Sequence, residues 1–251
     1  MAKIVKKNTS WWNVGSVLAK VDGDSLEEAD LEERDLSRTS LSSATIAGAK
    51  LNRATLSEAD LESANMRGVE AEEANFTKAN LSDADLSSAT LNSSRLDFAD
   101  LSRANLVNAS LKDASLVRSR LIDARLDGAD LSGATLEAAD LANASMNAAR
   151  FEKANLQQAD LSNSTLTETD FTGAKLQEAD LRESDLSGAT LIGADLSSAE
   201  LKNAKFDGAS YSPETKWPPD FSPDQHNLNK ITGAKKPEPG DAKDAWGVAD
   251  F

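Results

Sequence analysis

Few residues of this 251-residue chain have the chemistry of a catalytic group. His226 is the only histidine and there is no cysteine, so the chain lacks a Cys–His pair and the His/Cys sets that hold zinc. Serine and threonine are abundant, but no base is placed to activate them. The sequence contains neither a G-x-S-x-G turn nor a Gly-rich phosphate loop. We therefore expect a protein that is not an enzyme and has no cofactor.

Carboxylates are the remaining candidates, because Asp and Glu total 42 against 27 Lys and Arg, for a net charge of −15. General acid–base catalysis by paired carboxylates requires a pocket that excludes water and shifts their pKa values. Calcium requires six to eight oxygens that converge from a loop. Whether the carboxylates converge depends on the elements that position them.

Those elements are set by a repeat of five residues. The 38 positions at steps of five from Leu26 to Tyr211 are all apolar or aromatic, and Leu occupies 29 of them. Two residues before each, Ala also occupies 29 of the 38 positions. A step of five scatters these residues around an α-helix and alternates them across a flat strand, so neither element explains the pattern. A coil that turns a corner within each repeat brings every Ala and Leu to one interior.

Runs such as ADLSS, ADLSG and ANLSD resemble the A(D/N)LXX consensus of the pentapeptide-repeat family, over about three quarters of the chain. The resemblance implies an all-β fold, a right-handed quadrilateral β-helix with four repeats in each coil. The 38 repeats then make about 9.5 coils. Leucine fills the axis of this solenoid, so carboxylates on its flat sides diverge into solvent and we expect no metal site.

The chain divides into three parts on this interpretation. Residues 1–23 include a short helical cap, which starts at Thr9 or Ser10 and has apolar residues at Trp11, Val14, Leu18 and Val21. Residues 24–212 form the β-helix. Residues 213–251 begin with a cap at Trp217 and Phe221, similar to the C-terminal segments of cyanobacterial family members, and continue as a flexible Pro/Gly/charged tail. Trp246, Val248 and Phe251 are candidate docking residues, although a tail with little role is an open alternative.

Every fourth repeat lies on the same side of such a coil, and this places Asp140, Asp160, Asp180 and Glu200 in one acidic column. One explanation is repeat consensus, with Asp or Asn preferred for local turn hydrogen bonds. The other is a face that binds a partner with a basic surface. The negative charge disfavours direct binding to nucleic acid, and no stretch approaches the 18 apolar residues of a membrane helix, so we expect no membrane insertion.

Two functions remain open. The first is a structural or protein-interaction rod in the cytoplasm, monomeric or dimeric end to end. The second is a regulator of DNA gyrase that mimics DNA, since some members of the family protect gyrase from quinolones in this way. Arginines near the middle of the rod count against a mimic, as do the lack of a loop that interrupts the repeats and of a C-terminal apolar helix. These arginines are Arg95, Arg103, Arg118, Arg120, Arg125 and Arg150.

Overall fold

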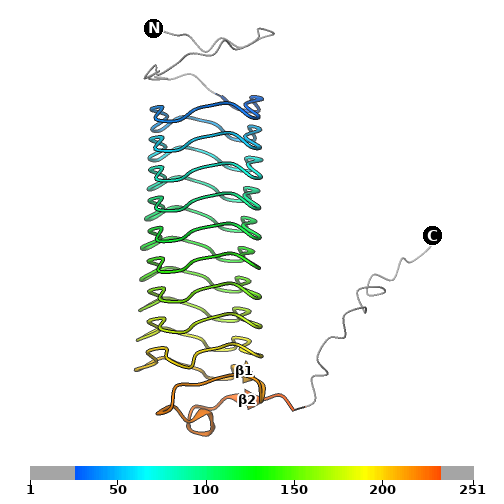
Figure 1. Cartoon of the computed structure of the whole chain (residues 1–251), viewed down its shortest axis with the longest axis vertical. Helices are drawn as coiled ribbons and strands as arrows, with labels where there is room; N and C mark the ends of the chain where they lie inside the picture. The colour runs from blue at the N-terminus through cyan, green and yellow to red at the C-terminus, as the bar shows by residue number, and fades with distance from the viewer. Residues whose placement is uncertain (1–25, 233–251) are drawn as a thin grey trace, which may run out of the picture.

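The computed structural model describes residues 26–232, whose repeats stack as successive coils of a rod (Figure 1). Bridged residues up to Ser210 are 20 positions apart, so each coil holds four repeats and the rod has four sides. Parallel β-bridges join each coil to the next, and each bridge is a single residue pair on one side of the rod. The first four are Asp30–Lys50, Asp35–Thr55, Ser40–Asp60 and Thr45–Asn65. This register continues unchanged to the Thr190–Ser210 bridge. The expected helical cap lies outside the described residues.

Each corner of the rod is a tight turn that begins at the central apolar residue. In the first described repeat, the amide of Ala29 donates to the carbonyl of Leu26 at 3.1 Å. Glu28, the third residue of that turn, has a φ of +53°, and the equivalent residue has a positive φ at every later corner up to Gly208 except Ser198. Most of these residues are not glycine, although the left-handed region costs an L-residue about 1–2 kcal/mol.

Hydrogen bonds between coils hold these turns in place. The amide of Leu26 donates to Thr45 one coil further on, at 2.7 Å, and the amide of Lys50 donates back to Ala29 at 2.9 Å. The same two bonds recur along the rod, so that successive coils are joined at every corner. Because a buried backbone group without a partner is costly, this ladder favours the strained turn over alternatives that leave amides unpaired.

The core is the axis itself, which the central residues and the preceding Ala residues fill. Almost all of them are fully buried, and Leu36 and Leu201 near the two ends are only partly buried. Where Ser or Thr replaces the inward Ala, its hydroxyl is satisfied: Ser94 donates to the carbonyl of Leu91 at 2.7 Å, and Thr169 to that of Met146 at 2.9 Å. Phe residues in adjacent coils stack, with the rings of Phe151 and Phe171 5.3 Å apart.

The last coil departs from the repeat. Asp195 bridges Lys216, one position beyond the partner that the regular register would give. The short strand β1 (Ser210–Tyr211) pairs in parallel with β2 (Asn229–Lys230), and between them lies a single 3-10 turn, η1 (Pro223–Gln225). Trp217, Phe221 and Leu228 pack against the end of the core, and the ring of Trp217 lies 4.7 Å from that of Phe221. These aromatic side chains cover the C-terminal end of the axis.

Candidate interaction surface

The four residues of the predicted acidic column lie in consecutive coils on one side of the rod. Asp140 bridges Asp160, Asp160 bridges Asp180, and Asp180 bridges Glu200. The three aspartates are half-buried and Glu200 is exposed. Neighbouring strands in a sheet are about 4.8 Å apart, so like charges at this spacing repel one another. The structure brings together the residues that the sequence predicted.

A local hydrogen bond explains why aspartate occupies these positions. Oδ1 of Asp140 accepts from the amide of Ala142 at 3.3 Å, and Oδ1 of Asp160 accepts from the amide of Ser162 at 2.9 Å. The same bond is made by Asp or Asn on the other three sides, for instance at Asp85. The carboxylate therefore holds the amide that begins the turn, and an asparagine side chain can make the same bond.

A cation lies beside the acidic column and pairs with two of its members. Arg182, on the turn that follows Asp180, forms ion pairs with Asp180 at 2.5 Å and with Glu200 at 3.2 Å. Its hydrogen bond to Asp180 lowers the pKa of that carboxyl below its ordinary value. The sequence carries a signal for this pairing, because Arg182 lies two residues after Asp180, on a turn position that the stacking of the residues before each leucine does not include.

The same side of the rod also carries positive charge at its middle. Arg120 lies between Asp100 and Asp140 in the column, and its guanidinium is 3.4 Å from Asp100. On the neighbouring corner, Arg103 forms a two-pronged bond to Asp83, with distances of 2.8 and 2.6 Å. The acidity of this side is thus concentrated between Asp140 and Glu200 rather than continuous along the rod.

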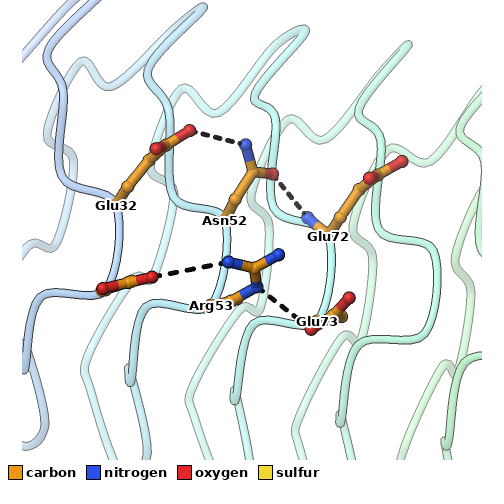
Figure 2. A pocket seen from close by; sticks show the side chains of 6 residues that line it. Glu32, Asn52, Arg53, Glu72 and Glu73 are labelled. Atoms are coloured by element: carbon orange, nitrogen blue, oxygen red, sulfur yellow. Dashed lines mark hydrogen bonds and ion pairs between the residues drawn. The ribbon is translucent and has the colours of Figure 1, made fainter.

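One hollow of about 160 Å³ lies on a corner near the N-terminal end of the described chain (Figure 2). Figure 2 shows that its groups already bind one another: Arg53 bonds to Glu73 at 3.2 Å, and Asn52 bonds both to the side chain of Glu32 and to the amide of Glu72. Glu32, Arg53, Glu72 and Glu73 are exposed to solvent. A hollow of this kind does not exclude water, so it lacks the desolvated pocket in which carboxylates act as catalytic acids and bases.

Among residues 26–232, no group of His, Asp and Glu residues is arranged to hold a metal ion. No helix in the same range has the length and apolar character that crossing a membrane requires. The predicted docking residues Trp246, Val248 and Phe251 lie outside the described residues, as does the remainder of the tail.

Comparison with known proteins identifies the repeat. Residues 25–57, 54–92, 94–133, 129–168 and 174–210 match the family described as pentapeptide repeats. The structure is similar to that of HetL, a pentapeptide repeat protein involved in heterocyst differentiation regulation from the cyanobacterium Nostoc sp. strain PCC 7120. The two share 34% identity over 72% of this chain and 86% of HetL, with a TM-score of 0.59.

A second similar structure is QnrB1, a plasmid-mediated fluoroquinolone resistance protein, with 19% identity over 72% of this chain and 89% of that one and a TM-score of 0.60. At this identity the likeness shows the fold alone. No curated protein matches the sequence. The family and its solved structures confirm the expected fold class, a right-handed quadrilateral β-helix.

Proposed function

Because the chain belongs to the pentapeptide-repeat family, we propose that it is a non-enzymatic scaffold that binds a protein partner in the cytoplasm through the outer surface of the rod. The observation that carries this proposal is the filled axis: leucine and alanine occupy the interior from coil to coil. Recognition is therefore left to the flat sides, the corners and the ends. HetL is involved in regulation, and this likeness favours a regulatory role over catalysis.

The contact surface in this proposal is the acidic column, Asp140, Asp160, Asp180 and Glu200, and its partner has a basic surface. Complementary charge steers association and fixes register more than it adds affinity. The side chains are held by the turn hydrogen bonds of Asp140, Asp160 and Asp180, so little side-chain freedom is lost when a cation binds.

Affinity capture with charge variants of the full chain tests this role. One variant changes the acidic column to amides, as Asp140→Asn, Asp160→Asn, Asp180→Asn and Glu200→Gln. A matched control makes the same charge change on other sides of the rod, as Asp85→Asn, Asp130→Asn, Asp170→Asn and Asp195→Asn. We expect a basic partner that the wild type and the control both retain and that the column variant loses. Equal retention by both variants would remove the acidic column as the contact.

The gyrase regulator is the alternative, and the acidic column is the observation in its favour. Arg120 and Arg182 weaken it, since both place positive charge on the side of the rod that would imitate the phosphate backbone. A supercoiling assay with purified gyrase distinguishes the two functions. Unchanged gyrase activity at micromolar concentrations of the rod would exclude the alternative.

A further inference from the structure

Phe98 is the most exposed large apolar side chain among residues 26–232, at 50% of its full accessibility. It is the third residue of its turn and has a φ of +60°. The corresponding corners elsewhere carry mostly polar residues or glycine. A bulky aromatic residue with positive φ is uncommon, and exposure of its ring to water adds a second unfavourable contribution. An outlier of this kind points to a function for the side chain.

Cations flank Phe98 along its corner of the rod. Hydrogen bonds join three successive turns there: the amide of Lys78 donates to Asp97 at 2.9 Å, and the amide of Phe98 donates to Val117 at 3.0 Å. Phe98 therefore lies between Lys78 in one coil and Arg118 in the next. Within the described range, neither Lys78 nor Arg118 forms an ion pair, whereas most of the neighbouring arginines do.

Two further side chains extend this surface. Val117, beside Arg118 on the same turn, is half-buried, and Arg95 lies three residues before Phe98. The Arg95 side chain is 63% exposed, at 3.8 Å from Asp97. We call Lys78, Arg95, Phe98, Val117 and Arg118 the Phe98 patch. Aromatic and arginine side chains dominate binding energy at protein interfaces, and this patch offers both.

The charge around the patch limits what can occupy it. Nucleic acid or an anionic membrane would extend past the patch and meet the rest of a rod whose net charge is −15. A short acidic segment with apolar side chains touches only the cations and the ring. The chain contains such a segment at residues 241–251, DAKDAWGVADF, which has three aspartates against the single Lys243 and carries the apolar side chains of Trp246, Val248 and Phe251.

The segment is long enough to reach the patch. Phe98 lies about six coils from the last coil, or roughly 29 Å at a strand spacing of ~4.8 Å. Thr232, the last described residue, is 14 positions before Trp246, and a chain of that length spans up to about 46 Å. The excess also allows the chain to pass around a corner of the rod.

We propose that residues 241–251 dock on the Phe98 patch of the same chain. Trp246 or Phe251 packs on the ring of Phe98, and Asp244 and Asp250 pair with Lys78 and Arg118. This gives the candidate docking residues of the tail a binding surface on the rod, which is separate from the acidic column of the proposed function. The exposed ring at a strained corner is then covered in the full chain.

Site-specific photocrosslinking in the full-length protein tests the proposal. p-Benzoylphenylalanine in place of Phe98 keeps an aromatic ring at the position, and trypsin releases a peptide that begins at Asp244. We expect irradiation to join this peptide to position 98 within one chain. The control carries the photocrosslinker at Gln158, on the same corner three coils away, and we expect at least a fivefold lower yield there.

Charge variants test whether ion pairs between the tail and the patch are needed for the crosslink. Arg118→Glu and Asp244→Lys, each combined with the crosslinker at position 98, are expected to lower the yield at least threefold, while the far-UV circular dichroism stays that of the parent. In chains that carry Asp244→Lys, trypsin releases the tail peptide from Ala245. Restored yield in the Arg118→Glu, Asp244→Lys double variant would support the pairing directly. Crosslinks that map elsewhere, equal yields from positions 98 and 158, or products only between two chains would overturn the proposal.

Discussion

The repeated coils and the C-terminal closing segment, residues 212–232, bury the apolar axis of the rod by different means. In the coils, each central apolar residue is covered by the central residues one coil above and one coil below, so the five-residue repeat is sufficient to bury the axis. The last coil has no coil beyond it, and there the register lengthens by one position at the Asp195–Lys216 bridge. Phe206, Tyr211, Trp217 and Phe221 form a cluster of rings over the exposed end.

The comparison shows what a repeat cannot do by itself. Each coil is stabilised by its neighbours, so an unprotected end exposes apolar surface and unpaired strand edges. Large aromatic rings bury more area per residue than leucine, and a few of them suffice to cover the axis. Proline at positions 213, 218, 219 and 223 removes amide donors from this segment, which limits further pairing.

The largest expected effect is in the axis of the coils. Leu121 is fully buried, and Leu121→Asp places an unpaired charge among leucines. We expect a loss of at least about 4 kcal/mol of unfolding free energy, or failure to fold. Ile122→Asp, at the next residue on the half-exposed turn, should cost less than about 1 kcal/mol. Denaturant titration of both variants measures the difference, and equal losses would mean that inside and outside are wrongly assigned.

Removal of a ring from the closing segment should have a smaller and more local effect. Trp217 lies 4.7 Å from Phe221 and 5.8 Å from both Phe206 and Tyr211, and its Nε1 is buried without a hydrogen-bond partner. We expect Trp217→Ala to cost about 2–4 kcal/mol. Hydrogen exchange should rise in the last two coils and remain unchanged at mid-rod.

Lys230→Ala, at an exposed position of β2, is the control for this variant and should leave exchange unaltered. A uniform rise in hydrogen exchange along the whole rod after Trp217→Ala would contradict a purely local role for the closing segment. It would mean that the coils depend on the closing segment for more than cover at one end.

The sequence predicted the coils more completely than the closing segment. Periodicity identified the residues of the axis, and the stacking of every fourth repeat identified the neighbours of Asp160, although the number of sides came from family resemblance. The extra residue before Lys216 was not predictable, because no repeat continues past it. Arg182 and Phe98 were missed for another reason: both are on turns, where the consensus allows almost any residue and only the fold shows what each one meets.

The left-handed turns were not predictable from the sequence either, because glutamate, arginine and lysine occupy positions where glycine would have indicated a positive φ. They provide a test in which one substitution has opposite effects at two sites. Ala148→Gly, at a φ of +54°, relieves strain of about 1–2 kcal/mol and costs ~0.5–1 kcal/mol of chain entropy, so stability should be unchanged or slightly raised. Ala144→Gly, at a buried inward position, should cost about 1 kcal/mol.

The reverse change should be unfavourable. Gly133 has a φ of +72°, and a Cβ there would approach Oδ1 of Asp113. Gly133→Ala should therefore destabilise by about 1 kcal/mol, partly offset if the Asp113 side chain rotates away. Thermal unfolding of the three variants ranks them, and an Ala148→Gly protein less stable than Ala144→Gly would show that the positive φ carries no strain.

The smallest expected effects distinguish two members of the acidic column. Asp160→Asn keeps an oxygen for the Ser162 amide and removes repulsion from Asp140 and Asp180, so stability should be unchanged or rise by less than about 0.5 kcal/mol. Asp180→Asn also loses the ion pair with Arg182 and should cost up to about 1 kcal/mol.

The dependence on pH identifies the cause of that difference. Arg182 lowers the pKa of Asp180 in the folded protein, so the unfolded chain binds its proton first as the pH falls. The stability that Asp180 contributes is complete above its ordinary pKa and is lost as the pH falls through the lower folded value. Asp180→Asn should therefore be less stable than Asp160→Asn at pH 7, and the two should converge once the pH has fallen below the lowered pKa of Asp180 in the folded protein. A difference in stability between the two variants that persists in acid would have to come from packing. The ion pair with Arg182 would then contribute nothing to the stability of the column.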